Sequence, residues 1–465
     1  MKGKYTLGEN EKIELKKIFS SNIDIIEREV QGKEGALGLE RDIEKLINTS
    51  FYNTNYMKRV PSHLFFIWLG RLEDSKLIYP KVWKKTGVKP IIYYDANAFL
   101  AGLYKSELLS ISKIEHADII EIQNSLYDFF IINEYRSFDS AFIDFVRLKS
   151  GEKCAAEYEN KLSTYKSFTD LSFEYIDINS FENLFYKSEL RRFYFYEVML
   201  RNNLAAACDI LRLLILYLLG GVYVDFDTLP DFSYIFKKTD FIIEQCSVNR
   251  NLVDIVRAEK VISKIDGEYS RNYTSREQDY LSFCVRHINH ENENILKQID
   301  SDIVEWNGSL DEFDFPFAYL HTGKISASKN CLAEYNNNIL AAHAKSKGIR
   351  ILFRVMTRRY RYLEKHGYVF GFDSLNRDAF YKSDYLERLK PYRLDGTSKS
   401  KNVTLILSGP SLLLEVILGL SYSLLSIDSG VSPLVISYAL RDKYIGIGFD
   451  NQTMFTLEHM QSSWM

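Results

Sequence analysis

Two carboxylates one residue apart, Asp225 and Asp227, are the side chains of this sequence best suited to chemistry. They follow an apolar stretch that is typical of a strand, and side chains of a strand alternate, so both should point the same way. Carboxylates that point the same way repel each other unless a cation lies between them. Oxygen ligands suit Mg2+ or Mn2+, which commonly bind one or two carboxylates plus substrate phosphates. The pair predicts a metal site for a diphosphate, with a solvated turn as the structural alternative.

A second acidic residue and a basic one, Asp209 and Arg212, precede that strand on an apolar helix. Residues spaced i, i+3 share a helix face and can pair. Their apolar neighbours indicate burial, where an unpaired charge is costly. The pair is either a structural ion pair or a group that binds sugar hydroxyls and phosphate.

Aromatic side chains offer two further candidates. Trp68 ends an apolar run and either belongs to the core or stacks on a nucleotide base. Ser462 and Trp464 lie near the C-terminus, where chain ends fray unless they are tied down. We expect this tail to fold over a bound phosphate.

The elements that must position these residues alternate between strands and helices, which indicates an α/β fold. Ligands of open α/β sheets bind beyond the carboxyl ends of the strands, and Asp225 follows such an end. We predict a helical insertion over about residues 104–168. The predicted strands cover residues 63–69, 90–94, 241–243 and 403–407. The predicted helices cover residues 77–85, 190–219 and 346–365, and a further helix is predicted to start at residues 95–98.

The composition limits the class of protein. The chain has 465 residues, 46% of them apolar, and a net charge of −3. This charge argues against a nucleic-acid partner bound by charge alone. Five scattered cysteines fit free thiols rather than a disulfide framework. The first residues do not resemble a signal peptide.

Several ordered segments resemble the glucosyltransferase domain of the large clostridial glucosylating toxins and related bacterial effector glycosyltransferases. The resemblance runs from about residue 60 to residue 464. Its segments are residues 66–70, 93–100, 205–212, 220–229, 335–340, 407–410 and 462–464.

The resemblance implies a GT-A fold of the nucleotide-diphosphosugar transferase type, with a Rossmann-like mixed sheet. It implies a helical N-terminal segment over residues 1–57, a candidate for membrane or partner docking that is shorter than the family's membrane-targeting bundle. The GT-A domain would cover residues 58–465, with helical insertions at about 104–168 and 345–395.

The implied reaction transfers one sugar, glucose or N-acetylglucosamine, from a UDP-sugar with retention and with Mn2+ or Mg2+. The implied acceptor is a threonine or tyrosine hydroxyl of a host small GTPase of the Rho or Ras class. We expect a monomeric bacterial effector, secreted or injected, that acts in the host cytosol at the inner face of the membrane.

The resemblance also implies the role of each site residue. The catalytic set would be Asp209, Arg212, Asp225, Asp227, Asn337 and Trp464. The donor would contact Trp68, Asn97, Tyr223, Asp225, Ser462 and Trp464. The metal ligands would be Asp227, Asp225, Ser462 and His459.

Two departures from the family pattern matter. His459 stands where the family has a glutamate ligand, and imidazole can ligate Mn2+ but removes a negative charge. Asn336 and Asn338 flank the donor-loop Asn337 without the bulk associated with glucose, which favours N-acetylglucosamine. The functional alternatives are a housekeeping glycosyltransferase of surface polysaccharide synthesis and a catalytically dead GTPase-binding module.

Overall fold

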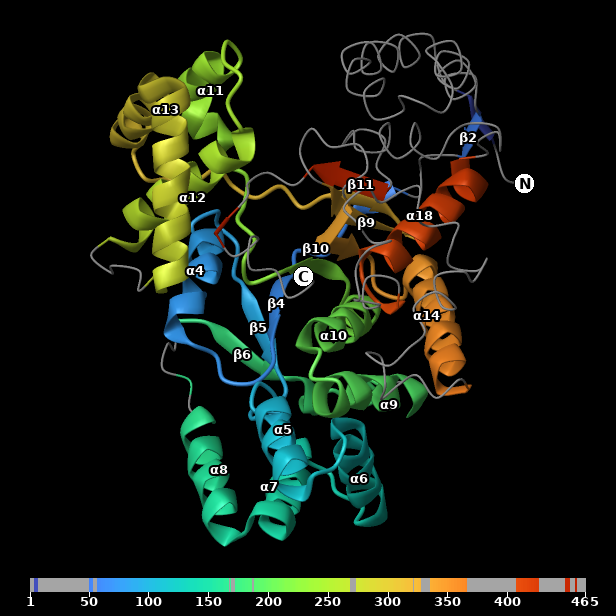
Figure 1. The fold of residues 1–465 in the computed structure, drawn as a ribbon. Helices are drawn as coiled ribbons and strands as arrows, with labels where there is room; N and C mark the ends of the chain where they lie inside the picture. The colour runs from blue at the N-terminus through green and yellow to red at the C-terminus, as the bar shows by residue number, and fades with distance from the viewer. Residues whose placement is uncertain are drawn as a thin grey trace, which may run out of the picture.

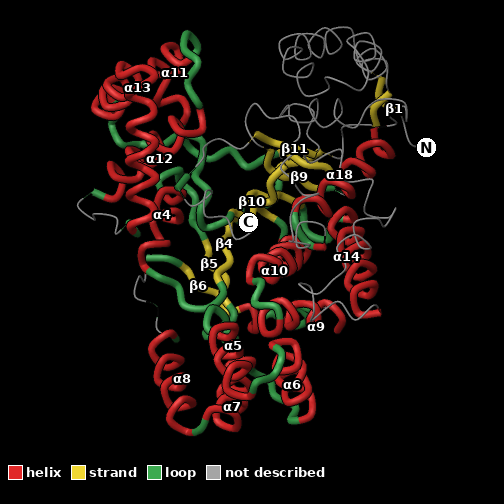
Figure 2. Tube along the Cα trace, in the orientation of Figure 1, coloured by secondary structure: helices red, strands yellow, loops and turns green. Residues whose placement is uncertain are grey.

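A seven-stranded mixed sheet forms the centre of the molecule (Figures 1 and 2). Its four strands β7, β4, β5 and β6 are parallel, β10 is antiparallel to both β7 and β9, and β11 is parallel to β9. In order across the sheet the strands are β11 (Gly448–Asn451), β9 (Gly323–Ala327), β10 (Tyr335–Ala342), β7 (Gly221–Val224), β4 (Leu64–Trp68), β5 (Ile91–Tyr94) and β6 (Glu174–Asp177).

The computed structural model describes most of the chain between residues 57 and 365 and shorter parts outside it. Two further ladders pair β1 (Lys4–Thr6) with β2 (Ser50–Tyr52) and β3 (Met57–Arg59) with β8 (Phe317–Tyr319). The described residues are 4–6, 50–52, 57–166, 168, 172–185, 188–267, 273–320, 322–327, 335–365, 407–425, 448–451 and 456–457. Most of residues 1–57, where helices are expected, lies outside the described residues. The described parts of that range include β1 and β2, which are strands rather than helices.

Both faces of the central sheet are buried, and this explains the continuous apolar run of β4. Phe65 and Ile67 pack in one hydrophobic cluster with α10 (Leu204–Leu219), α14 (Lys347–Lys365) and α18 (Pro410–Leu425). Leu64 and Phe66 point to the opposite face, where they join Trp83 of α4 (Ile78–Lys84). Buried parallel strands lose the polar alternation that one-sided strands show.

Helices also form two outlying groups (Figure 1). Four helices separate β5 from β6, within the predicted insertion: α5 (Tyr104–Glu115), α6 (Ile119–Ile132), α7 (Phe138–Ser150) and α8 (Glu152–Tyr165). A second apolar cluster joins α4 to η5 (Ser233–Phe236), α11 (Lys237–Ile243), α12 (Arg250–Asp266) and α13 (Ser275–Glu305). In the part of the chain that the structure describes, no helix is long and apolar enough to cross a bilayer.

Two predicted elements are wrong, and most of a third lies outside the described residues. Residues 241–243 belong to helix α11, which the hydrogen bond from the Thr239 hydroxyl to Asp302 joins to α13. The strand prediction failed because an apolar run of three residues does not distinguish helix from strand. Asp95 does not start a helix: its carboxylate accepts from the Asn97 N–H and the Tyr194 hydroxyl, and it caps a turn instead. Of the strand predicted at 403–407, residues 403–406 lie outside the described part.

The helix predicted over residues 190–219 is two helices with a break. The first is α9 (Ser188–Phe195), which continues into a π-helical turn, η4 (Tyr196–Leu200). The chain turns at Asn202, whose φ is 48°, and α10 starts after Asn203, whose side chain accepts from the Ala206 N–H at 3.1 Å. Asparagine tolerates a positive φ and caps helices well, so the two asparagines explain the break.

Candidate functional site

Asp209 and Arg212 form a buried ion pair on α10. Their side chains are 0% and 2% exposed, and a guanidinium nitrogen of Arg212 bonds directly to Oδ1 of Asp209. The i, i+3 spacing on a helix places both groups on one face. This confirms the predicted pairing and burial of the two residues.

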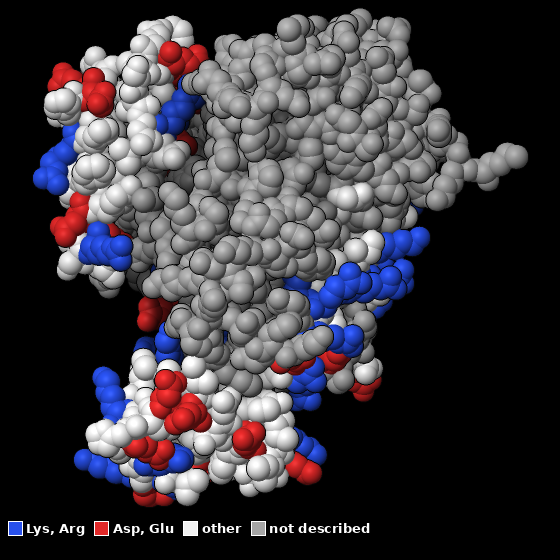
Figure 3. Space-filling view, turned by 45° about the vertical axis from the view of Figure 1, so that its right-hand side comes forward, with Lys and Arg blue, Asp and Glu red and all other residues white. Residues whose placement is uncertain are grey.

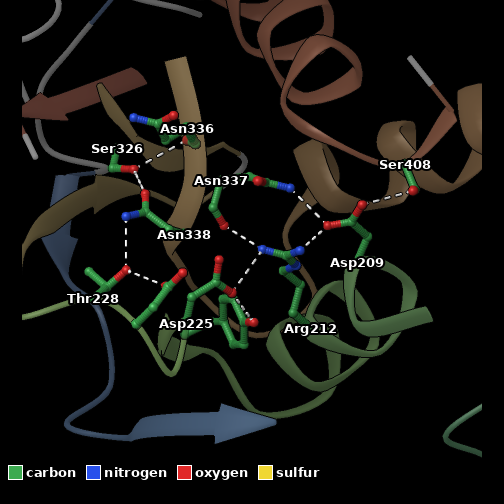
Figure 4. Close-up of polar contacts among 11 residues, drawn as sticks. Asp209, Arg212, Asp225, Thr228, Ser326, Asn336, Asn337, Asn338 and Ser408 are labelled. Carbon is green, nitrogen blue, oxygen red and sulfur yellow. Dashed lines mark hydrogen bonds and ion pairs between the residues drawn. The ribbon is translucent and has the colours of Figure 1, made fainter. Parts of the chain in front are cut away.

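Residues from two distant segments complete the surroundings of Asp209 (Figure 4). The Asn337 side-chain amide, from β10, donates to Oδ1 at 2.8 Å. The Ser408 hydroxyl, just before α18, donates to Oδ2 at 2.8 Å. Arg212 in turn donates to the backbone carbonyl of Asn337. Each oxygen of the buried carboxylate therefore has a fixed donor, which holds it in one orientation.

The chain reaches Asp225 through a turn that only glycine can form. Gly220 and Gly221 have φ values of 72° and 108°, a region that other residues rarely adopt. A Cβ atom on Gly221 would lie 2.2 Å from the His63 carbonyl oxygen, which accepts the Val222 N–H at 2.7 Å. The tight turn brings β7 directly against β4 and places its carboxyl end beside α10.

Asp225 connects this end of β7 to the buried pair. Its Oδ1 lies 3.5 Å from Nη1 of Arg212 and accepts a hydrogen bond from the Tyr223 hydroxyl. The Arg212 guanidinium also lies over the Tyr223 ring, 4.7 Å from its centroid. Asp209, Arg212, Tyr223, Asp225 and Asn337 thus form one contiguous polar network, as the predicted site requires.

Asp227 is held differently from the sequence prediction. β7 ends at Val224, and the Thr228 N–H bonds to the Asp225 carbonyl at 3.1 Å, so Asp227 belongs to a turn. The expectation that both carboxylates extend from one strand face is therefore wrong for Asp227. Thr228 also donates its hydroxyl to Oδ1 of Asp227 at 3.3 Å, a bond within the turn.

A chain of hydrogen bonds supports that turn from the neighbouring strands. The Asn338 side chain, from β10, donates to the Thr228 hydroxyl at 2.9 Å. Its own side-chain oxygen accepts from the Ser326 hydroxyl of β9. This series of hydrogen bonds runs from Ser326 through Asn338 and Thr228 to Asp227 and connects the turn to β10 and β9. Figure 4 shows Ser326, Asn338 and Thr228 in this arrangement.

Burial raises the pKa of two carboxyl groups at the site, those of Asp209 and Asp227. Desolvation raises the pKa of Asp209 to about 7, and the charge of Arg212 opposes this rise. Desolvation also raises the pKa of Asp227, which the Thr228 hydroxyl opposes. A desolvated carboxylate gains much from an added cation.

The donor set of this turn fits a divalent cation in part. Asp225 and Asp227 supply carboxylate oxygens, the ligands that Mg2+ and Mn2+ prefer, and among the described residues the Asp227 carboxylate accepts a hydrogen bond from the Thr228 hydroxyl. Among the described residues no group of three or more His, Cys, Asp or Glu side chains could hold a metal ion. The two aspartates would therefore hold a cation together with other ligands, such as substrate phosphates.

Trp68 lies next to the turn and Asn97 lies farther along the sheet edge. The Trp68 ring packs edge-on against the ring of Phe226, at a centroid distance of 4.9 Å. Phe226 is the residue between Asp225 and Asp227 in the sequence. Asn97 joins a separate cluster beyond β5, where its side chain donates to Asn179 at 3.1 Å. The described hydrogen bonds do not connect Asn97 to Asp225.

His459, Ser462 and Trp464 lie outside the described residues, so their predicted roles stay predictions. The described part of the C-terminal segment nevertheless reaches the site. The Thr456 hydroxyl donates to the backbone carbonyl of Asp227 at 3.0 Å, and Leu457 is buried in the cluster of α4 and α12.

Sequence reasoning assigned no role to three residues that hold the site together: Ser408, Thr228 and Ser326. Ser408 lies in the resembling segment 407–410 and Thr228 in the resembling segment 220–229, and this was the available signal for both. Ser326 lies in none of the resembling segments, and short hydroxyl side chains are common throughout the chain, so nothing in its spacing distinguishes it.

Comparisons with known proteins agree with this fold. The family described as the TcdA/TcdB catalytic glycosyltransferase domain matches residues 62–383. The catalytic domain of alpha-toxin from Clostridium novyi superposes with a TM-score of 0.64 at 19% identity, covering 97% of this chain and 89% of that one. The UDP-bound glycosyltransferase domain from the YGT toxin gives 0.54 at 18% identity, with 87% and 82% covered. The predicted GT-A fold is confirmed.

Two toxins are similar in sequence. Cytotoxin-L of Paraclostridium sordellii is 27% identical over 257 residues, which are 49% of this chain and 11% of that toxin. Toxin B of Clostridioides difficile is 27% identical over 201 residues, 37% of this chain and 8% of that toxin. The chain therefore matches only about a tenth of the length of these relatives. Because the family match covers more than half of the sequence, the chain belongs to the TcdA/TcdB catalytic glycosyltransferase domain family.

Proposed function

We propose that this protein transfers one sugar from a UDP-sugar to a hydroxyl group of a host small GTPase of the Rho or Ras class, with retention at the anomeric carbon. The observation that carries the proposal is the contiguous network of Asp209, Arg212, Asp225 and Asn337. These four side chains come from α10, β10 and the end of β7. A fold does not determine a function, so the argument rests on this site.

The network suits a sugar diphosphate. Asp209 would accept hydrogen bonds from hydroxyl groups of the donor sugar, and the side-chain amide of Asn337 beside it would also contact the sugar. Arg212 supplies a permanent positive charge for phosphate, and a guanidinium matches phosphate oxygens in geometry as well as charge. Trp68, next to the Asp225–Asp227 turn, would offer its ring to the uracil base.

Departure of UDP places negative charge on the β-phosphate, and the site must stabilise that charge. Asp227 and Asp225 would hold Mn2+ or Mg2+, which supplies a Lewis acid when bound. Ser462 and Trp464 would close over the donor and exclude water that would hydrolyse it. The Thr456 contact with Asp227 supports this role, because it lies six residues before Ser462.

The division into a segment over residues 1–57 and a GT-A domain over residues 58–465 is part of the same proposal. We propose N-acetylglucosamine rather than glucose as the donor sugar, because of Asn336 and Asn338. The protein would act as a monomer in the host cytosol, as a secreted or injected bacterial effector.

Metal-dependent hydrolysis of UDP-sugars by the purified protein tests the catalytic part of the proposal. We expect UDP release with Mn2+, faster from UDP-N-acetylglucosamine than from UDP-glucose, and none with a chelator. A protein that binds small GTPases but releases no UDP from either donor is the catalytically dead module. A protein that labels surface polysaccharide and no host protein is the housekeeping transferase.

A further inference from the structure

The loop that follows β5 packs against the segment that follows β4. We call residues 95–103 the β5 loop, which connects β5 to α5 through a series of turns. β4 and β5 lie side by side in the sheet, and β4 ends at Trp68. A Cβ atom on Gly70 would lie 3.5 Å from the Gly102 nitrogen and 3.6 Å from the Phe99 carbonyl oxygen. The β5 loop therefore lies against the chain two residues after Trp68, whose ring would bind the uracil base.

One buried carboxylate, Asp139 of α7, binds the middle of the β5 loop. Its Oδ2 accepts the Phe99 N–H at 2.8 Å, and its Oδ1 accepts the Leu100 N–H at 2.9 Å. The Tyr104 hydroxyl donates to the same Oδ1 at 2.6 Å. The backbone N–H of Asp139 donates to the Asn97 carbonyl at 3.2 Å. The helical insertion thus reaches the loop through a single residue that is 1% exposed.

The three donors to this carboxylate are neutral, and they compensate for its burial. Desolvation raises the pKa of Asp139, while the hydrogen bonds from the Tyr104 hydroxyl and the two loop N–H groups oppose the rise. Hydrogen bonds to an ionised acceptor are roughly twice as strong as neutral ones. Without the carboxylate, three buried donors would lack an acceptor. Asp139 therefore fixes the backbone of the loop in one conformation.

A second buried carboxylate fixes the start of the loop. Asp95 accepts the Asn97 N–H and the Tyr194 hydroxyl, each at 2.8 Å, and the Asn179 side chain at the same distance. Asn97 is therefore held on both sides, with its N–H bound by Asp95 and its carbonyl bound by Asp139. Asn97 is also the loop residue that is expected to contact the donor.

The helices of the insertion support Asp139 as a rigid group. Arg147 of α7 pairs with Glu152 and Glu159 of α8, and Lys149 pairs with Glu115 of α5. Figure 3 shows Lys and Arg beside Asp and Glu on this lower part of the molecule, without a region of one sign on the face in view. The charges of the insertion thus join its own helices, and its link to the site is internal.

We propose that Asp139 is a positioning residue for the nucleoside end of the donor site, because it holds the β5 loop against the segment that carries Trp68. The inference rests on the proposed function, since it takes a UDP-sugar as the donor. Asp139 is buried behind the loop and would not touch the donor. A loop that is fixed before binding loses less conformational freedom when the nucleoside binds. The four-helix insertion would then serve donor binding from behind the loop.

The variant D139N tests this role. Asparagine keeps the shape of the side chain but turns one acceptor oxygen into an amide donor, which would face a backbone N–H of the loop. We expect hydrogen exchange of residues 96–103 to accelerate. The KM for hydrolysis of UDP-N-acetylglucosamine and the Kd for UDP with Mn2+ should rise about tenfold, while kcat changes less than about twofold. Such a split indicates a loss of binding that the ground state and the transition state share.

The matched control is D302N in α13. Asp302 is also buried and also accepts three hydrogen bonds, from Thr239 and Gln298. It belongs to the helical group of α11, α12 and α13, which supplies none of the proposed site residues. D302N should lose thermal stability as D139N does, but keep the wild-type KM and Kd. An equal change of KM in both variants would reduce Asp139 to a structural role and overturn the proposal.

A milder variant decides the question if D139N does not fold. Y104F removes one donor to Asp139 and leaves both loop amides in place, so KM should rise about threefold at constant kcat. An unchanged KM in Y104F would then overturn the proposal. Wild-type protein that binds no UDP contradicts the proposed donor itself. Wild-type protein that binds UDP, with D139N binding it equally tightly, contradicts only the role of Asp139.

Discussion

The Asn337 side chain donates a hydrogen bond to Oδ1 of Asp209 at 2.8 Å, although 128 residues separate the two in sequence. This bond joins the strand next to β7 to the helix that precedes β7. It fixes the orientation of a buried carboxylate that the proposed reaction would use to bind the donor sugar. Removing either partner leaves the other buried without its bond, which is costly.

The aspartates of the turn should be essential for transfer and dispensable for folding. In the variant D225N/D227N the side chains keep their shape but lose the charge that would hold a divalent cation. We expect an unchanged circular dichroism spectrum and a fall in UDP-sugar hydrolysis of at least about 10²–10³-fold. Calorimetric titration with Mn2+ and UDP should show weaker binding. A purified, folded variant with wild-type activity contradicts the assignment.

Ser408 should act as a positioning residue for Asp209. The variant S408A removes the donor to Oδ2, and one unsatisfied buried acceptor costs about 1–3 kcal/mol. We expect a moderate loss of thermal stability together with a larger fall in kcat than change in KM. S411A is the control, because Ser411 is equally buried and makes no contact with Asp209 among the described residues. Similar kinetics for both variants would show that Ser408 has only a structural role.

Thr228 should tune the affinity for the metal through Asp227. T228V keeps the size of the side chain but removes the hydroxyl that donates to Asp227 and accepts from Asn338. Loss of such a supporting bond typically weakens metal binding about 10–100-fold, and we expect this change in the Mn2+ titration. T239V, at a buried threonine that bonds to Asp302, should reduce stability alone. An unchanged Mn2+ affinity in T228V argues against the supporting chain.

The Gly220–Gly221 turn should tolerate no side chain. In G221A the new Cβ would lie 2.2 Å from the His63 carbonyl, at a φ of 108°. We expect a loss of about 2–4 kcal/mol in the free energy of unfolding. G419A is the control: nothing lies within 4 Å of the added carbon on α18, and alanine favours a helix. Equal urea midpoints for the two variants would refute this account of the turn.

His63 should make the fold sensitive to mild acid. Its Nδ1 lies 2.9 Å from the Gly220 carbonyl and its Nε2 lies 3.1 Å from the Tyr93 hydroxyl. Burial lowers the pKa of His63 below its usual 6.5, so the unfolded chain takes up this proton first. Stability should be fullest above pH 6.5 and fall as the pH drops below it.

Urea unfolding at about pH 7.5 and about pH 5.5 checks the role of His63. The His63 contribution lowers the wild-type free energy of unfolding at the acidic pH, while protonation of Asp209, whose pKa is raised to about 7, acts in the opposite direction. The free energy of unfolding of H63Q should therefore fall less, or rise more, on acidification than that of the wild type, because glutamine does not titrate. An equal difference in both proteins would assign the acid sensitivity to other groups.

The sequence allowed the core of the sheet to be predicted because buried parallel strands are continuous apolar runs, as β4 shows. Spacing singled out Asp209, Arg212 and Asp225, the resemblance alone added Asn337, and the structure brings the four side chains together. The sequence did not reveal that α10 begins only after Asn203, because apolar residues continue on both sides of the break. It also could not assign Ser408, whose partner lies 199 residues away. Such long-range bonds leave no periodic pattern in the sequence.

The most direct test of the central claim is mass spectrometry of a panel of Rho and Ras small GTPases after incubation with the protein, Mn2+ and separate UDP-sugars. The account predicts the mass of one N-acetylhexosamine on a threonine or tyrosine of at least one GTPase, with no modification by D225N/D227N. Intact GTPases in every reaction, with wild-type protein that is folded and active in UDP release, would contradict the claim.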